Sequence, residues 1–111
     1  MRLQGGAARL TIVVDELDSW HHRPLYVEIV ARAHAEGLAG ATAVRGIQGF
    51  AGGSPIHHQR LFHLGDHVPV IVTIVDSHAR LDAFLTSLDE VLHKGVAMLD
   101  DVEVVRYIKG H

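Results

Sequence analysis

The chain has 111 residues, of which 48% are hydrophobic and 21% charged. These values are typical of one globular domain, and no apolar run approaches the roughly 20 residues that a membrane-spanning helix needs. A formal net charge of −3 and only 5% aromatic residues argue against nucleic-acid binding. Without a signal-peptide core or any cysteine, the chain is expected to be cytoplasmic and not inserted into a membrane.

The first half of the chain predicts a strand, a helix and a second strand. Residues 1–7 carry no pattern and are interpreted as a flexible N-terminus. Residues 8–15 alternate between apolar and polar positions, as a strand does, and 15–22 form a polar turn. Residues 24–36 have apolar positions at helical spacing, between a proline suited to the first helical position and a glycine suited to follow the last turn. Residues 41–47 predict the second strand.

The second half begins with the strongest strand of the chain. Residues 68–75 form an almost unbroken apolar run, which predicts a central strand that is buried on both faces or nearly so. A short strand at 61–64 is a candidate just before it. Asp76 or Ser77 is expected to cap a second helix that ends at Gly95.

The last strand is predicted at 102–108, after a connection at 96–101. The order is therefore strand, helix, strand, strand, helix, strand. Two such βαβ halves predict a ferredoxin-like α+β sandwich, an antiparallel four-stranded sheet with both helices on one face. No linker or repeat interrupts the pattern, so residues 1–111 are expected to form a single domain.

The sheet face opposite the helices is predicted to be too apolar to stand in water. The residues expected there are Val13, Ala43, Arg45, Ile71, Thr73, Val75, Val105 and Tyr107. An open apolar face of this kind is normally covered by another subunit. The pattern therefore predicts an oligomer.

Glycine gathers in the segment after the second strand. Gly46, Gly49, Gly52 and Gly53 fall within eight residues, and Arg45, Gln48 and Phe50 lie beside them. Because glycine lacks a Cβ, such a backbone reaches φ > 0 and can expose its N–H groups to an anion. This segment is the candidate site for a ligand or a partner.

Three stretches of the chain resemble one known family. The stretches are RPLYVEIVARAHAEGLAGATAVRGIQGFAG, VPVIVTIVDS and DEVLHKGVAMLDDVEVVRY. They are similar to the uncharacterised PII-like family catalogued as domain of unknown function 190, over about residues 9–108. The resemblance implies a ferredoxin-like fold and a homotrimer with the sheets facing inward. It also implies a long loop after the second strand, the T-loop, which corresponds to residues 46–60.

PII-like proteins are signalling proteins that usually bind a small effector, often an adenine nucleotide, in clefts between subunits. The T-loop then reports to a protein target, commonly a membrane transporter or an enzyme. This chain departs from PII proteins because residues 46–60 contain no tyrosine that could be modified. By position, the resemblance implies ligand-binding roles for Arg45, Gly46, Gln48, Gly49, Phe50, Lys94, Gly95, Arg106 and Lys109.

Each of these residues also has a purely structural interpretation. Arg45 would serve equally in an intersubunit salt bridge with Asp15 or Glu16, and the glycines in turn geometry. Phe50 would serve as a packing anchor of the loop. Lys94 closes the second helix, where a cation complements the helix dipole without any ligand. Arg106 and Lys109 would be solvated residues at an edge.

The histidines suggest an alternative function, a metal-binding trimer or a structural adaptor that binds no nucleotide. His57 and His58 are adjacent, so on an extended chain they point to opposite faces, and no cysteine completes a zinc site. His63, Asp66 and His67 are acid–base residue types in one stretch, but no nucleophile or phosphate-loop motif accompanies them. We therefore expect a protein that is not an enzyme.

Overall fold

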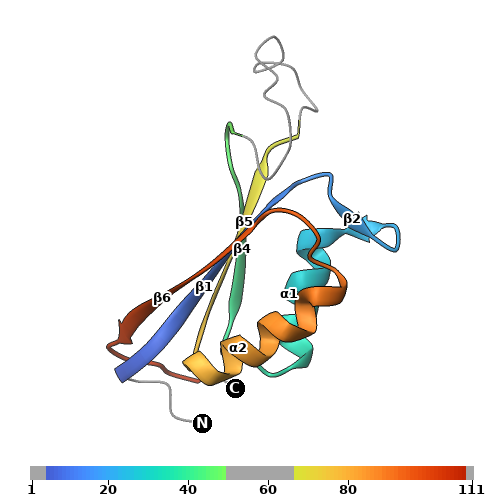
Figure 1. Ribbon diagram of the computed structural model, residues 1–111. Coiled ribbons are helices and arrows are strands. Elements are labelled where there is room, and N and C mark those ends of the chain that lie inside the picture. Colours follow the sequence, from blue (N-terminus) through green and yellow to red (C-terminus); the bar gives the residue numbers. More distant parts are fainter. Residues whose placement is uncertain (1–4, 50–66, 110–111) are drawn as a thin grey trace.

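The computed structural model describes residues 5–49 and 67–109 (Figure 1). The candidate strand at 61–64 and the residues Phe50, His57 and His58 lie outside this part of the chain. The elements are β1 (Gly5–Asp15), β2 (Ser19–Trp20), β3 (Arg23–Pro24), α1 (Leu25–Ala35), β4 (Ala41–Arg45), β5 (Pro69–Asp76), α2 (His78–Ser87), the 3-10 turn η2 (Leu88–Glu90) and β6 (Val96–Val104).

Four strands form one antiparallel sheet in the order β4-β5-β1-β6. Both helices cover the same face of this sheet (Figure 1). The predicted ferredoxin-like α+β sandwich is therefore confirmed. The strands β1 and β5 are central, and the prediction of a central strand at residues 68–75 is therefore confirmed.

The core lies between the sheet and the two helices. Alternate residues of β1 and β5 are fully buried there against apolar residues of α1 and α2. These buried residues are Leu10, Ile12, Val14, Val70, Val72, Ile74, Leu25, Ile29, Leu81 and Phe84. Their spacing is two in the strands and three or four in the helices, which explains why these segments take these forms.

The prediction that β5 is buried on both faces or nearly so is met only on the helix side in the single chain. Val70, Val72 and Ile74 are buried, whereas Ile71 on the other face is 37% exposed. We call this other side, opposite the helices, the open face. The apolar character of β5 therefore leaves a bare surface, as the oligomer prediction assumed.

Pairing between strands corrects the membership of the open face. Ala43 pairs with Val72 and Arg45 with Val70, so both lie on the helix side of β4. Val105 and Tyr107 lie beyond the end of β6. The open face instead carries one aliphatic residue from each strand in a single row, Val44–Ile71–Val13–Val96.

The last strand begins six residues earlier than predicted. Residues 96–101 belong to β6, in which Val96 pairs with Val13 and Asp100 with Arg9. An aspartate is unfavourable in a strand, but the Arg9 guanidinium donates two hydrogen bonds to Asp100, at 2.7 and 3.2 Å. This cross-strand pair explains why an apparent connection is a strand.

Other element boundaries differ slightly from the predictions. β4 ends at Arg45 rather than at residue 47. Pro24 is the N-cap of α1 rather than its first residue, and α2 gives way to the 3-10 turn after Ser87. These shifts place Gly46 and Gln48 in the connection beyond β4.

The hairpin of β2 and β3 was not predicted. Its two turn residues, His21 and His22, have φ of 50° and 68°. Such a turn normally uses asparagine and glycine, and two histidines carry no hairpin signal. The Trp20 ring stacks on the His21 ring at 3.7 Å, and the Arg32 guanidinium lies 4.9 Å from the Trp20 ring centroid.

Candidate functional site

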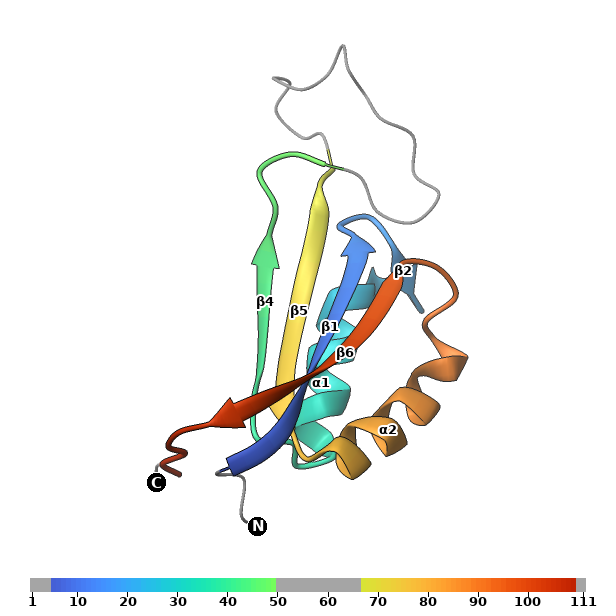
Figure 2. The ribbon, with the colours of Figure 1, turned by 60° about the vertical axis from the view of Figure 1, so that its left-hand side comes forward.

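The candidate residues are divided between the two ends of the sheet. At one end, which we call the loop end, β1 and β4 finish and β5 and β6 begin (Figure 2). Arg45, Gly46, Gln48, Gly49, Lys94 and Gly95 are all connected to strands there. Arg106 and Lys109 follow the opposite end of β6.

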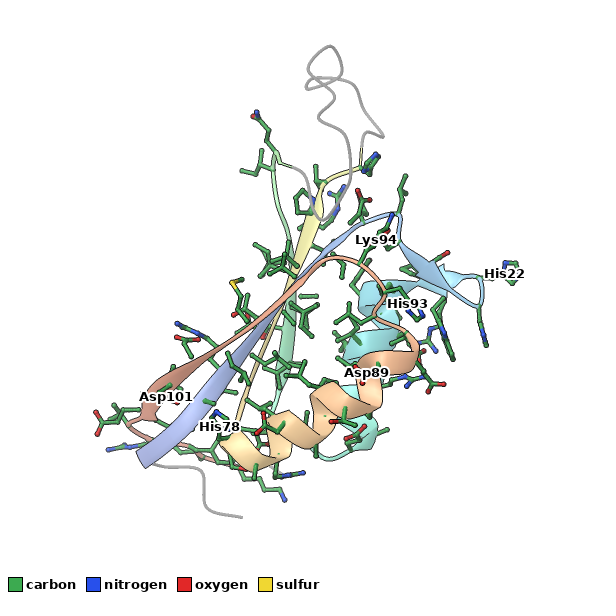
Figure 3. All side chains as sticks on the ribbon, viewed as in Figure 1. His22, His78, Asp89, His93, Lys94 and Asp101 are labelled. Carbon is green, nitrogen blue, oxygen red and sulfur yellow. The ribbon has the colours of Figure 1, made fainter. Side chains whose placement is uncertain are left out.

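The length of β6 separates these two groups within one chain. β6 has nine residues and therefore spans about 30 Å. Figure 3 shows Lys94 toward the loop end, whereas Asp101, late in β6, lies at the other end. Lys109 lines a shallow groove there with His34 and Tyr107. Arg106 and Lys109 would reach a loop-end site only from a neighbouring subunit.

Gly46 and Gly49 both pack against Pro69, the first residue of β5. The Gly46 N–H donates a hydrogen bond of 2.7 Å to the Pro69 carbonyl oxygen. A Cβ on Gly46 would lie 3.3 Å from that oxygen, and one on Gly49, at φ +147°, would lie 3.2 Å from Pro69 Cγ. The structure therefore gives both glycines a role in turn geometry, and it gives the Gly46 N–H a partner within the chain.

Arg45 forms an ion pair with Glu16 of the same chain. Its Nε lies 2.6 Å from Glu16 Oε2 and its Nη2 lies 3.0 Å from Glu16 Oε1. Through this hydrogen-bonded pair, Arg45 lowers the pKa of Glu16, and Glu16 raises the pKa of Arg45. The salt-bridge interpretation of Arg45 thus holds, but within one subunit.

Lys94 is paired in the same way. Its ammonium nitrogen lies 3.3 Å from Asp18 Oδ1. Asp18 Oδ2 accepts a hydrogen bond of 3.0 Å from the Asp15 N–H, so the carboxylate is held in a fixed position. Asp18 and Glu16 belong to the same short turn after β1.

Gly95 is required by the backbone itself. Its φ is +106°, and a Cβ at this position would lie 2.4 Å from the Val13 carbonyl oxygen. A side chain cannot occupy that space, so the chain can enter β6 beside β1 only with glycine here. Gly95 therefore has a structural role that is independent of any ligand.

The sequence analysis named Asp15 or Glu16 as a salt-bridge partner of Arg45, but it gave residues 15–18, which we call the acidic turn, no role at the site. Asp15 Oδ1 accepts a hydrogen bond of 2.8 Å from the Leu17 N–H, and the Glu16 N–H donates one of 2.9 Å to the Val68 carbonyl oxygen. His67 Nδ1 lies 2.6 Å from Asp15 Oδ2. The run Asp-Glu-Leu-Asp after a strand was the available signal, but only the structure shows that it faces the cations.

No group of three or more potential metal ligands occurs in the ranges that the structure describes, 5–49 and 67–109. His57 and His58 lie outside these ranges, so the metal interpretation of that pair stays a prediction.

None of the helices in the described parts of the chain is long and apolar enough to cross a bilayer.

The sheet topology and the helix layer define a ferredoxin-like fold. The solved structure of CPII bound to ADP and bicarbonate, from Thiomonas intermedia, superposes with a TM-score of 0.66, covering 91% of this chain and 90% of that one. The two sequences are 16% identical, so this likeness concerns the fold.

The family is defined by the sequence. Residues 7–104 match the model of DUF190, described as "Uncharacterized ACR, COG1993", and the chain belongs to this family. A UPF0166 protein of Aquifex aeolicus is 35% identical over 96 residues, 86% of this chain and 90% of that protein. A UPF0166 protein of Methanocaldococcus jannaschii is 30% identical over 98 residues, 87% of this chain and 90% of that protein.

Proposed function

We propose that this chain is a PII-like regulator that binds a small anionic effector, an adenine nucleotide, in clefts between the subunits of a homotrimer. It has no catalytic activity of its own. Effector binding changes the connection between β4 and β5, which acts on a protein target such as a transporter or an enzyme. The effector class is suggested by CPII, whose structure was solved with ADP and bicarbonate.

One observation carries this proposal. Two cations, Arg45 and Lys94, lie at the same end of the sheet as the connection between β4 and β5. Both side chains are 60% exposed, so an anion can reach them from solvent. A guanidinium and an ammonium together suit a phosphate or carboxylate group.

The open face supplies the second element of the proposal. Val44, Ile71, Val96 and Met98 are large apolar residues exposed on this face. Further copies of the chain cover these residues. Arg106 and Lys109 of a neighbouring copy then lie near the loop end and add positive charge to the effector site. The cleft is then built from two subunits.

Isothermal titration calorimetry with AMP, ADP, ATP, cyclic dinucleotides and simple carboxylates tests the proposal. We expect at least one adenine nucleotide to bind, and Arg45→Ala to weaken it by about tenfold or more, because a charged hydrogen-bond partner is lost. Arg23→Ala removes another arginine of the surface, one paired with Glu28 at 3.2 Å, and should leave the affinity unchanged. Absence of heat with every nucleotide would overturn the nucleotide proposal.

A further inference from the structure

The two cations of the proposed effector site already have anionic partners, and both partners come from the acidic turn. Glu16 pairs with Arg45, and Asp18 pairs with Lys94. The turn thus reaches cations attached to β4 and to β6, the two edge strands of the sheet. An effector that binds Arg45 and Lys94 must therefore compete with these carboxylates.

We propose that the acidic turn is a built-in competitor of the effector, so that binding exchanges the Glu16 carboxylate for an anionic group of the ligand. This inference rests on the proposed function and concerns the regulation of the same site. Glu16 and Asp18 become determinants of effector affinity, although neither is a ligand-binding residue in the usual sense.

On the side of the guanidinium that Glu16 occupies, the geometry of the Arg45 pair requires an exchange rather than an addition. Both Glu16 oxygens are engaged, at 2.6 Å by Nε and at 3.0 Å by Nη2. These two donors form one side of the guanidinium fork, which binds one carboxylate or one phosphate edge at a time. A ligand group can take this side only after the Glu16 side chain leaves it.

Glu16 is suited to leave without disturbing the backbone. Its side chain is 24% exposed and has solvent to move into. Its N–H remains bonded to the Val68 carbonyl oxygen, so the end of β1 and the start of β5 stay joined. Departure of the carboxylate therefore costs the ion pair and does not unfold the turn.

Asp18 plays a different part, because it is held in place. Its side chain is only 12% exposed, and Oδ2 is bonded to the Asp15 N–H. Lys94 carries three donors on a flexible stem and can contact a ligand while it stays near Asp18. Asp18 thus lowers the positive potential at Lys94 without blocking it.

The exposure of the pairs sets the size of the effect. Exposed ion pairs contribute little to stability, so displacing one weakens ligand binding by a small factor, about two- to fivefold. The acidic turn therefore tunes the affinity for the effector and does not close the site.

The test compares ADP and inorganic pyrophosphate binding to the full chain and to Glu16→Gln, by calorimetry. Glu16→Gln keeps the size and the backbone bond of the residue and removes its charge. We expect both ligands to bind about two- to fivefold more tightly to the variant. Asp82→Asn changes the net charge equally on α2 and should leave both affinities unchanged, since Asp82 pairs with His78 rather than with Arg45 or Lys94.

Salt dependence gives a second measurement that a merely structural role would not alter. In the wild type, binding replaces one ion pair by another, so the affinity should fall gently with salt. In Glu16→Gln, binding creates a new ion pair, and the affinity should fall more steeply. Asp18→Asn, which keeps an acceptor oxygen for the Asp15 N–H, should tighten binding as well.

The outcomes separate this inference from the proposed function. If the wild type binds ADP and Glu16→Gln binds it no more tightly, the exchange is wrong while the nucleotide site stands. If pyrophosphate binding tightens in Glu16→Gln but ADP never binds, the exchange is supported and the nucleotide is not the effector. If neither protein binds any anion, both proposals are overturned.

Discussion

At the scale of single residues, Gly95 allows the most definite prediction about the stability of the fold. Its φ of +106° and the 2.4 Å approach of a Cβ to the Val13 carbonyl oxygen leave no room for alanine. This oxygen belongs to the backbone and cannot rotate away as a side chain can, so β6 would have to move away from β1. We expect Gly95→Ala to lower the free energy of unfolding by at least about 2 kcal/mol, measured by urea denaturation.

Gly40→Ala is the matched control for this substitution. A Cβ on Gly40 would meet no atom within 4 Å. Alanine there should be neutral or stabilise the fold by up to about 1 kcal/mol, because it restricts the unfolded chain. Equal unfolding midpoints for the two variants would contradict the steric role of Gly95.

Single residues also show why the site was only half predictable. Arg45 was identified because it lies beside a glycine-rich segment, and Lys94 because the family resemblance implies a role for its position. Of their partners, Glu16 was named only as one of two alternatives for an intersubunit pair, and Asp18 was not identified, because a polar turn after a strand is most simply explained by exposure. Which turn faces which cation depends on the packing of β1 between β5 and β6, and the sequence alone does not contain that geometry.

At the scale of elements, regular periodicity was predictable and special conformations were not. The strands β1 and β5 and both helices follow from the spacing of their apolar residues. The β2–β3 hairpin does not, because His21 and His22 adopt positive φ without the usual asparagine or glycine. The early start of β6 was hidden for a related reason, since Asp100 is unfavourable in a strand until Arg9 is placed opposite.

Asp76 joins β5, the start of α2 and the α1–β4 connection, so removing its carboxylate should lower the stability of the fold. This fully buried carboxylate ends β5, accepts hydrogen bonds from the Ala39 N–H at 2.9 Å and the Ser77 N–H at 2.6 Å, and lies 3.5 Å from the Arg80 guanidinium. Asp76→Ala leaves two backbone donors without an acceptor. We expect a loss of about 3 kcal/mol in unfolding free energy, measured by thermal or urea denaturation.

The control for Asp76 is Asp82, an aspartate of α2 whose side chain is 60% exposed. Asp82→Ala should change the unfolding free energy by no more than about 0.5 kcal/mol, because exposed ion pairs contribute little. If Asp76→Ala lowers the unfolding free energy by no more than this, water must replace the carboxylate between β5 and the α1–β4 connection.

At the scale of the whole molecule, the two faces of the sheet explain the expected assembly. One face is covered by the chain's own helices, and the open face carries the row Val44–Ile71–Val13–Val96, one residue from each strand. The sequence predicted an uncovered apolar face, although it assigned Ala43 and Arg45 to it wrongly. It could not fix the register, because a shift of one residue exchanges the two faces of a strand.

The row of aliphatic residues predicts an interface between copies of the chain, and one charge there should break the homotrimer that we propose. Light scattering should give about three times the chain mass of 12.1 kDa for the wild type. Ile71 is 37% exposed in the single chain and lies at the centre of the row, so Ile71→Glu should place a charge in the buried interface and give a monomer. Thr86→Glu adds the same charge at an exposed position of α2 and should leave the trimer intact.

A wild-type chain that stays monomeric at micromolar concentration would mean that the open face is stable in water. Without neighbouring copies, Arg106 and Lys109 would then have no route to the loop end.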